Sequence, residues 1–239
     1  MRDTVIRLED VCVDIPLRGV GASRAHDDPR IQRHGRHLML RALDHVSLEI
    51  ARGERVGIRG SNGAGKTTLL KVIGGLLPAT SGRVTVSAST RALLTVAAGT
   101  VPSLTGRQNA RIRYALLGLR STSLQAYVED VERFAGLGAF FDLPVGSYSP
   151  GMQSRLQFAM NTVEPAEILL LDEWMGVADG EFQKKAQDRL LGFIEKNEGF
   201  LFASHDAHLV ESTTDRQLWL KDGQVVRDDR HDTLLRAAR

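Results

Sequence analysis

One nine-residue stretch constrains the fold of this chain more than any other. Residues 60–68 read Gly-Ser-Asn-Gly-Ala-Gly-Lys-Thr-Thr and match the phosphate-binding P-loop pattern Gly-x-x-x-x-Gly-Lys-Ser/Thr. The apolar run 55–59 before it predicts a strand, and the run 67–73 after it predicts a helix, which is the context that a P-loop requires. A glycine-rich turn before an ordinary helix is the alternative, and the complete order of strand, loop and helix disfavours it.

The residue types of this loop suit phosphate binding. Glycines let the backbone turn tightly without a Cβ, so that successive N–H groups point into one concavity, and the dipole of the next helix adds positive potential there. We expect the phosphates of ATP to be held by Gly60, Ser61, Asn62, Gly63, Ala64, Gly65, Lys66, Thr67 and Thr68. Lys66 is expected to reach the β- and γ-phosphates, and the Thr67 hydroxyl to bind Mg²⁺.

Acidic residues follow a second apolar strand. Residues 168–173 read Ile-Leu-Leu-Leu-Asp-Glu, and ligands of parallel sheets bind at the carboxyl ends of the strands. Asp172 is expected to hold the metal, directly or through water, and Glu173 to face the attacking water as general base. His205 ends the next predicted strand and would hydrogen-bond the γ-phosphate from the same edge. A solvated acidic turn and a surface histidine are the alternatives.

Two strands are predicted before the P-loop strand, at residues 4–15 and 38–50. They suggest a small antiparallel layer that leans on a nucleotide-binding core. The segment 18–37 between them is rich in Arg, His, Gly and Asp and is predicted to be a surface loop. Further short strands are expected at 83–87, 91–96, 167–171 and 200–204.

A helix-rich insert is predicted at residues 105–163. Thr105 with Gln108 forms a capping box, and serines at 121 and 123 can cap the next helix. Ser149 followed by Pro150 is a strong start for a third helix, whose N–H groups could bind an anion. After a further helix at about 180–195, the tail carries a hairpin signal at Asp222-Gly223 and a short helix at about 231–238.

Composition excludes several other classes of protein. The chain has 239 residues, of which 42% are hydrophobic, as expected for one globular domain. Its net charge of +2 gives no electrostatic case for binding nucleic acid. Cys12 is the only cysteine, which excludes a disulfide framework and a cysteine-based zinc site within one chain. The first residues make a poor signal peptide, and no apolar run approaches the roughly 20 residues that span a bilayer.

These motifs, in this order, resemble the nucleotide-binding subunits of ABC transporters. The resemblance covers residues 4 to about 228, and the run 148–156, Tyr-Ser-Pro-Gly-Met-Gln-Ser-Arg-Leu, is similar to the family's signature motif. A narrower resemblance is to the polysaccharide exporters of O-antigen, capsule and teichoic acid. It rests on that run, on Leu-Thr-Gly-Arg-Gln-Asn at 104–109, on residues 172–185 and on Val-Cys-Val-Asp-Ile-Pro at 11–16.

The resemblance implies roles for further residues. Ser149 and Gly151 would contact the γ-phosphate held by the P-loop of a second subunit, so that two ATP molecules are sandwiched in a head-to-tail homodimer. Asp179 would cross the dimer interface. Ile15 lies where an aromatic residue would stack on adenine, and Thr95 lies near where Gln or Glu would link the metal to the membrane partner.

Two other departures from the family pattern are visible. Trp174 replaces a proline that is usual in the wider family. Pro150 replaces a glycine of the signature motif and so removes one N–H group that could have met phosphate.

The expected fold is α/β, in one domain of residues 1–239. It comprises a RecA-like P-loop NTPase core, an N-terminal antiparallel β layer over about 1–55 and an α-helical subdomain over about 97–163. The relatives' extra C-terminal carbohydrate-binding domain is not expected here.

The resemblance further implies an ATPase that drives export of a lipid-linked polysaccharide. It would sit at the cytoplasmic face of the inner membrane, with a permease docked on residues 96–145. Alternatives are a motor for a lipid or drug and a soluble ABC-type ATPase acting on DNA or ribosomes. A P-loop kinase is disfavoured by the Ser149 helix and by the acidic strand end at Asp172.

Overall fold

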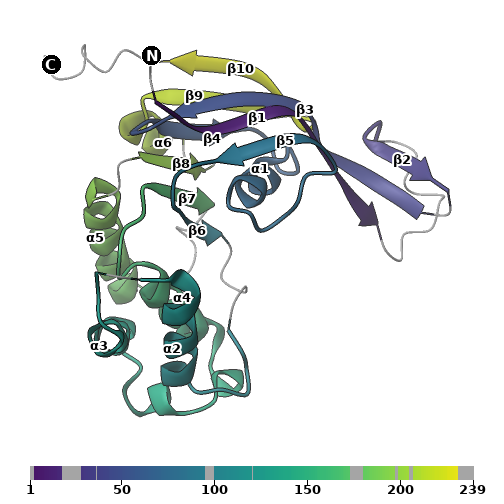
Figure 1. Cartoon of the computed structure of the whole chain (residues 1–239). Helices are drawn as coiled ribbons and strands as arrows, with labels where there is room; N and C mark the ends of the chain where they lie inside the picture. The colour runs from purple at the N-terminus through teal and green to yellow at the C-terminus, as the bar shows by residue number, and fades with distance from the viewer. Residues whose placement is uncertain are drawn as a thin grey trace, which may run out of the picture.

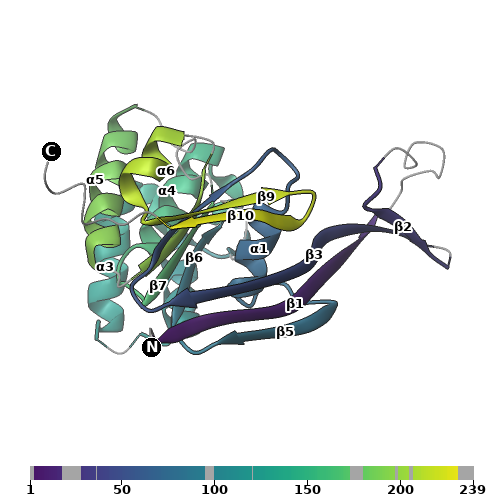
Figure 2. The same cartoon turned by 90° about the horizontal axis from the view of Figure 1, so that it is seen from above.

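Two long strands near the start of the chain dominate an antiparallel sheet in the computed structural model of this protein. The structure describes residues 3–17, 28–35, 37–94, 100–119, 121–172, 180–196, 199–204 and 207–230. The strand order in the antiparallel sheet is β2-β3-β1-β5. Its strands are β1 Thr4–Leu17, β2 Ile31–His34, β3 His37–Ala51 and β5 Ser81–Val86. Figure 2 shows β1 and β3 running side by side from the N-terminus to β2 at their far end.

The second sheet carries the P-loop and is mainly parallel. Its order is β10-β9-β4-β8-β7-β6, and only β10 pairs antiparallel with its neighbour among these described strands. The strands are β4 Arg55–Arg59, β6 Thr90–Leu94, β7 Ile168–Asp172, β8 Gly199–Ala203, β9 Arg216–Lys221 and β10 Gln224–Arg230. The predicted α/β architecture with an antiparallel layer is therefore confirmed.

The apolar run of β7 is explained by helices on both faces of the parallel sheet. Ile168 and Leu170 belong to the core cluster that includes α1, Lys66–Ile73, and the inner face of the antiparallel sheet. Leu169 and Leu171 point the other way, into a cluster with α5, Gly180–Lys196, and α6, Ala207–Thr213. Parallel strands covered on both faces lose the alternation of polar and apolar residues.

A group of helices forms a separate layer, which Figure 1 shows below the parallel sheet. Its helices are α2 Gly106–Leu117, α3 Leu124–Ala135 and α4 Pro150–Asn161, with short 3₁₀ turns at Gly138–Asp142 and Val145–Ser147. The predicted starts of these helices are confirmed. Thr105 and Gln108 make the capping box of α2, Ser123 caps α3, and Ser149 caps α4 with Pro150 in the first turn. Among the described residues, no helix is both long and apolar enough to cross a bilayer.

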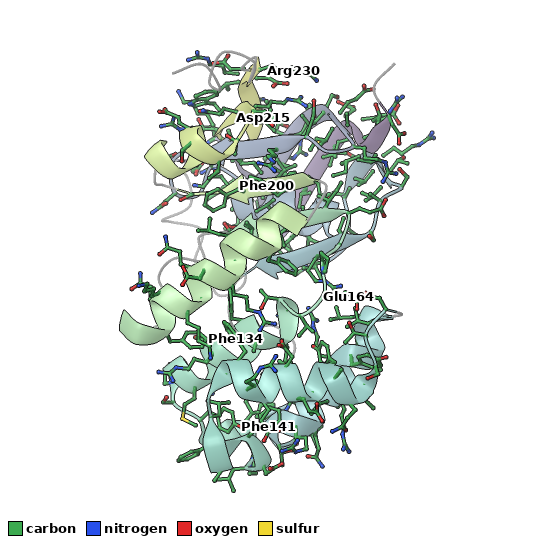
Figure 3. All side chains as sticks on the ribbon, turned by 90° about the vertical axis from the view of Figure 1, so that its left-hand side faces the viewer. Phe134, Phe141, Glu164, Phe200, Asp215 and Arg230 are labelled. Atoms are coloured by element: carbon green, nitrogen blue, oxygen red, sulfur yellow. The ribbon has the colours of Figure 1, made fainter. Side chains whose placement is uncertain are left out.

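Helix α5 joins the helical layer to the parallel sheet. In its N-terminal half Phe182 and Ala186 pack into the core of the helical layer, whereas Leu190 and Phe193 pack beneath the sheet. Figure 3 shows α5 crossing from the region of Phe200 to that of Phe134. One helix thus buries side chains in two cores, which fixes the helical layer against the sheet.

The structure corrects two sequence predictions and adds one helix. Part of the predicted loop 18–37 is a strand, because Ile31–His34 pair with the extended start of β3, and an edge strand tolerates polar residues. The antiparallel layer takes its fourth strand from Ser81–Val86, beyond the range of about 1–55. Helix α6 was not predicted, because its seven residues are too few to show a helical period. The predicted tail helix at about 231–238 lies outside the described residues.

Arg216 ties the two sheets together from a buried position. Its side chain is 4% exposed, and Nη1 donates to the Glu49 carbonyl of β3 at 2.7 Å and to Glu54 at 2.9 Å. Its Nε and Nη2 donate to the Asp228 carboxylate of β10 at 2.7 and 2.6 Å. Such forked, charge-assisted hydrogen bonds satisfy the buried guanidinium.

We expect Arg216→Gln to lower the free energy of unfolding by about 3 kcal/mol, because it leaves the largely buried Glu54 carboxylate and the Glu49 carbonyl without this cation. Chemical denaturation of purified protein measures this. Arg7→Gln is the matched control, since Arg7 pairs with Glu49 at 3.2 Å on the surface, with both side chains about half exposed. That variant should lose about 1 kcal/mol or less. Equal losses in the two variants would contradict the role assigned to Arg216.

Candidate functional site

The P-loop connects β4 to α1 through three glycines with positive φ angles. Gly60, Gly63 and Gly65 have φ angles of +150°, +76° and +108°, which L side chains rarely adopt. A Cβ at Gly60 would lie 2.3 Å from the Leu220 carbonyl oxygen, and one at Gly65 would lie 2.7 Å from that of Ala42. The loop is therefore shaped by backbone from β9 and β3 packed directly against it.

Lys66 lies along this loop and is only 5% exposed. Its Nζ donates to the carbonyl oxygens of Gly60 at 2.8 Å and Ser61 at 3.1 Å. An ammonium has three donors, so these two bonds leave one for an acceptor outside the loop. Gly65, which precedes α1, offers no side-chain cap, so the first N–H groups of α1 are open to an anion.

The hairpin of β9 and β10 supports the P-loop from behind. The Gly223 N–H donates to the Ala64 carbonyl at 3.0 Å, and the Gly223 carbonyl accepts from the Asp44 N–H at 2.9 Å. The hairpin signal at residues 222–223 was visible in the sequence, but this contact was not. Gly223 has a φ of +84° and no room for a Cβ, because one would lie 3.0 Å from the Ala42 carbonyl oxygen.

Sequence reasoning also missed Arg30, whose side chain reaches the same loop. Its Nη1 donates to the Gly63 carbonyl at 2.7 Å. Arg30 stands in the segment that was predicted to be a surface loop, and nothing in its local pattern indicates a contact 33 residues away.

Asp172 lies at the same edge of the sheet as the P-loop. It pairs with Ala203 of β8, and Ala203 pairs with Ile58 of β4, just before the loop. Two strand spacings of about 4.8 Å therefore separate Asp172 from β4, or about 10 Å. Leu94 of β6 pairs with Asp172 on the other side, so the carboxyl ends of four strands meet here. The predicted site residues Thr95, Glu173, Asp179 and His205 lie outside the described residues, as does Trp174.

Ile15 lies on β1 opposite Leu40 of β3. Its side chain is partly buried and packs against the main core cluster. The structure therefore places an apolar side chain at this position, on a strand that extends past the core toward β2.

The start of α4 presents Ser149 and Gly151 on the surface of the helical layer. The Ser149 hydroxyl accepts from the Met152 N–H at 3.3 Å and so caps the helix. A Cβ at Gly151 would meet nothing closer than this hydroxyl at 3.9 Å, so the helix end is open. The described contacts do not bring it to the P-loop of the same chain.

The runs 104–109 and 148–156, which are far apart in the sequence, are in contact at this helix end. The Tyr148 hydroxyl donates to the Phe140 carbonyl at 2.6 Å, and burial raises the pKa of this phenol. A Cβ at Gly106 would lie 2.6 Å from the same hydroxyl, so only glycine fits there. Arg107 beside it pairs with Glu132 and Asp142. The run 104–109 therefore positions the segment that leads into Ser149.

A cluster of Cys12, Asp44 and His45 has donor atoms within 4.8 Å of one another. The Arg41 guanidinium already fills this cluster. Its Nη1 donates to Asp44 at 3.0 Å and lies 3.7 Å from the Cys12 sulfur, and its Nε donates to Asp14 at 2.6 Å. A metal ion would have to displace this arginine. The guanidinium of Arg41 is therefore the cation that Asp14 and Asp44 bind here.

Comparison with known proteins decides the family. The profile of the ABC transporter family matches residues 43–176. This chain belongs to the ABC transporter family. The match spans β4, the P-loop, the helical layer and the strand that ends in Asp172, so the family assignment rests on the region described above.

The chain is similar to the ATP-binding proteins of two export systems. The chain is 39% identical over 194 residues to the O-antigen export system ATP-binding protein RfbE of Yersinia enterocolitica, which covers 81% of each chain. It is 36% identical over 184 residues to the teichoic acids export ATP-binding protein TagH of Enterococcus faecalis, which covers 77% of this chain but only 41% of TagH.

A solved structure shares the fold. It is the dimeric, post-hydrolysis state of the ATP-binding cassette MJ0796 bound to ADP and Pi, at 22% identity and a TM-score of 0.69. The alignment covers 94% of this chain and 98% of that one.

We expect Gly60→Ala to damage the folded state more than Gly63→Ala, because only Gly60 has backbone within contact distance. Both variants carry the strain of a positive φ, of order 1–3 kcal/mol. Nothing lies within 4 Å of a Cβ at Gly63, whereas at Gly60 the Leu220 carbonyl must move. Thermal unfolding of the nucleotide-free proteins compares them, and a Gly63→Ala variant as unstable as Gly60→Ala would contradict this account.

Proposed function

We propose that this chain is the ATP-binding and ATP-hydrolysing subunit of an ABC transporter that exports a lipid-linked polysaccharide. The observation that carries the proposal is the P-loop, with its inward-facing lysine and uncapped α1, set at one sheet edge with Asp172. Similarity to RfbE and TagH supports the O-antigen or teichoic acid class of cargo. The chain spans less than half of TagH, so the partners and cargo of such a protein are part of the proposal.

The loop fits the triphosphate of ATP by charge and by shape. The third donor of Lys66 and the N–H groups at the start of α1 would face the β- and γ-phosphates. The positive φ angles at Gly60, Gly63 and Gly65 favour glycine, and glycine brings no side chain into this concavity. Ile15 would offer a flat apolar contact to the base in place of aromatic stacking.

The Thr67 hydroxyl and the Asp172 carboxylate are the residues that would hold Mg²⁺. Both are oxygen donors, which this cation prefers, and both belong to the edge where β4 and β7 end. Bound Mg²⁺ neutralises charge on the phosphates. Glu173, next in the chain, would accept the proton of the attacking water, and His205 would hydrogen-bond the γ-phosphate. Thr95, shorter than Gln or Glu, would reach the metal through water.

The exposed start of α4 supports a head-to-tail homodimer. Ser149 and Gly151 are exposed at the start of α4. Helix α4 belongs to the helical layer, which lies below the sheet that carries the P-loop (Figure 1). In a symmetric pair, each α4 start would meet the γ-phosphate bound to the partner's P-loop, with Asp179 at the interface. The dimeric state of the MJ0796 cassette, which shares the fold, is consistent with this pairing.

The helical layer is the proposed docking face for a membrane permease. Six of the nine large apolar side chains that are exposed among the described residues belong to this layer or to the segment that leads into α2, and exposed apolar surface is typical of interaction sites. They are Val101, Ile112, Leu116, Leu124, Phe140 and Leu143, with exposures of 40–71%. Docking would hold the subunit at the cytoplasmic face of the inner membrane, and no nucleic acid is needed.

We expect Lys66→Ala to abolish the thermal shift that ATP with Mg²⁺ produces. Saturating ligand at about 100 times its Kd stabilises a protein by about 2.7 kcal/mol, which a thermal scan resolves. Lys71→Ala is the matched control, because Lys71 lies in the last turn of the same helix, and its shift should persist. An unchanged shift in Lys66→Ala would count against the phosphate site.

We expect Glu173→Gln to keep ATP binding but to lower the turnover rate about 100-fold or more, because the amide cannot accept the water proton. Phosphate release under saturating ATP measures the rate. Hydrolysis near the wild-type rate would exclude Glu173 as the general base.

A further inference from the structure

The guanidinium of Arg30 bridges the Asp28 carboxylate and the P-loop. Its Nε and Nη2 donate to the two oxygens of Asp28 at 3.0 and 2.6 Å, and its Nη1 donates to the Gly63 carbonyl at 2.7 Å. Its own carbonyl accepts from the Arg41 N–H of β3 at 2.8 Å, which anchors its backbone. The Arg30 side chain is 19% exposed, so it is part of the packed structure rather than a solvated arm.

The Asp28 carboxylate accepts hydrogen bonds from both the side chain and the backbone of Arg30. The Arg30 side chain, with its backbone N–H at 3.0 Å, lowers the pKa of Asp28 to about 2. The ion pair therefore persists at neutral pH, and both groups stay charged. Bidentate pairing of this kind fixes the plane of the guanidinium, which in turn fixes the direction of the remaining Nη1 donor toward Gly63.

Of the three P-loop glycines with positive φ, Gly63 is the one that no neighbouring backbone confines. Gly60 and Gly65 are confined by the backbone of Leu220 and Ala42, but nothing lies within 4 Å of a Cβ position at Gly63. A glycine in open space visits many conformations at little cost. The Gly63 carbonyl and the Ala64 N–H belong to one planar peptide group and point in opposite directions. Arg30 holds the carbonyl of this peptide, and the Ala64 N–H donates to the Ser61 carbonyl at 3.2 Å, so the two bonds together fix the orientation of the Gly63 peptide within the loop.

We propose that Arg30 is a positioning residue for nucleotide binding, which holds the Gly63 peptide so that the P-loop is shaped for phosphate before ATP arrives. The inference rests on the proposed function, because it assumes that the loop binds ATP. Asp28 fixes the orientation of the Arg30 side chain, and Arg30 fixes the Gly63 carbonyl. In this proposal Arg30 does not contact the phosphates. Preorganisation of this kind lowers the ordering cost of binding and leaves the chemical step unchanged.

Four variants test this positioning role. Arg30→Gln removes the fork, and Arg30→Lys keeps the charge but cannot hold Asp28 and Gly63 together through one planar group. Asp28→Asn keeps Arg30 but weakens its anchor. Arg7→Gln is the control, because it also removes a guanidinium that pairs with a carboxylate. Arg7 pairs with Glu49 at 3.2 Å on the antiparallel sheet and has no role in the proposed nucleotide site.

The measurements are the Kd for ATP by titration calorimetry, and kcat and KM from phosphate release. We expect Arg30→Gln and Arg30→Lys each to raise the Kd and KM about tenfold, because a charge-assisted hydrogen bond is lost, with kcat within twofold of wild type. The Kd of Asp28→Asn should lie between those of wild type and Arg30→Gln, and Arg7→Gln should bind ATP as tightly as wild type.

Three results would overturn the inference. The first is an unchanged Kd in Arg30→Gln. The second is a wild-type Kd in Arg30→Lys beside a weakened Arg30→Gln, which would show that charge alone acts. The third is a loss in Arg7→Gln equal to that in Arg30→Gln. If the wild-type protein itself binds no ATP, the proposed function fails first, so that the two failures are distinguishable.

Discussion

The packing of backbone against the P-loop is the constraint on which the rest of the structure depends. The loop can turn its N–H groups inward only if its outer side is closed by other main chain. The carbonyls of Leu220 and Ala42 lie where side chains at Gly60 and Gly65 would be, and the Gly223 N–H bonds to Ala64. Strands from both sheets and the tail hairpin thus meet at one short loop. The buried Arg216 joins the same strands at another point, because it bonds to Glu49 of β3 and to Asp228 of β10.

A second requirement is that the helical layer keep a fixed orientation to the parallel sheet. Helix α5 meets it by contributing Phe182 to one core and Phe193 to the other. Within the layer, Gly106 lies directly against the Tyr148 hydroxyl, so the start of α2 sets the segment that leads into α4. The exposed Ser149 is therefore displayed by a rigid assembly. The proposed contact of Ser149 with a partner subunit's nucleotide would need such support, because small errors of position weaken a polar contact steeply.

Local signals in the sequence predicted the parts of the structure that local chemistry determines. The P-loop, the capping box of Thr105 and Gln108, and the Ser149 start of α4 each depend on residues within a few positions of one another. The β2 strand depends instead on pairing with β3, and Arg30 depends on Gly63, 33 residues away. Contacts of that kind leave no pattern in a single sequence. The proposal that Ser149 pairs with the P-loop of a second subunit came from the resemblance to a family and not from spacing in this sequence.

That pairing is the central claim, and engineered cysteines test it most directly. Asn62 and Ser149 are both exposed, and the native Cys12 is buried, so Asn62→Cys and Ser149→Cys can be combined in a Cys12→Ser, Glu173→Gln background. Under mild oxidation with ATP and Mg²⁺, we expect a disulfide-linked dimer. It should be absent without nucleotide and absent when the cysteine is moved from Ser149 to Ser123, an equally exposed helix cap on α3. A chain that binds ATP but gives only monomer, or that links equally well through Ser123, would contradict the shared nucleotide site.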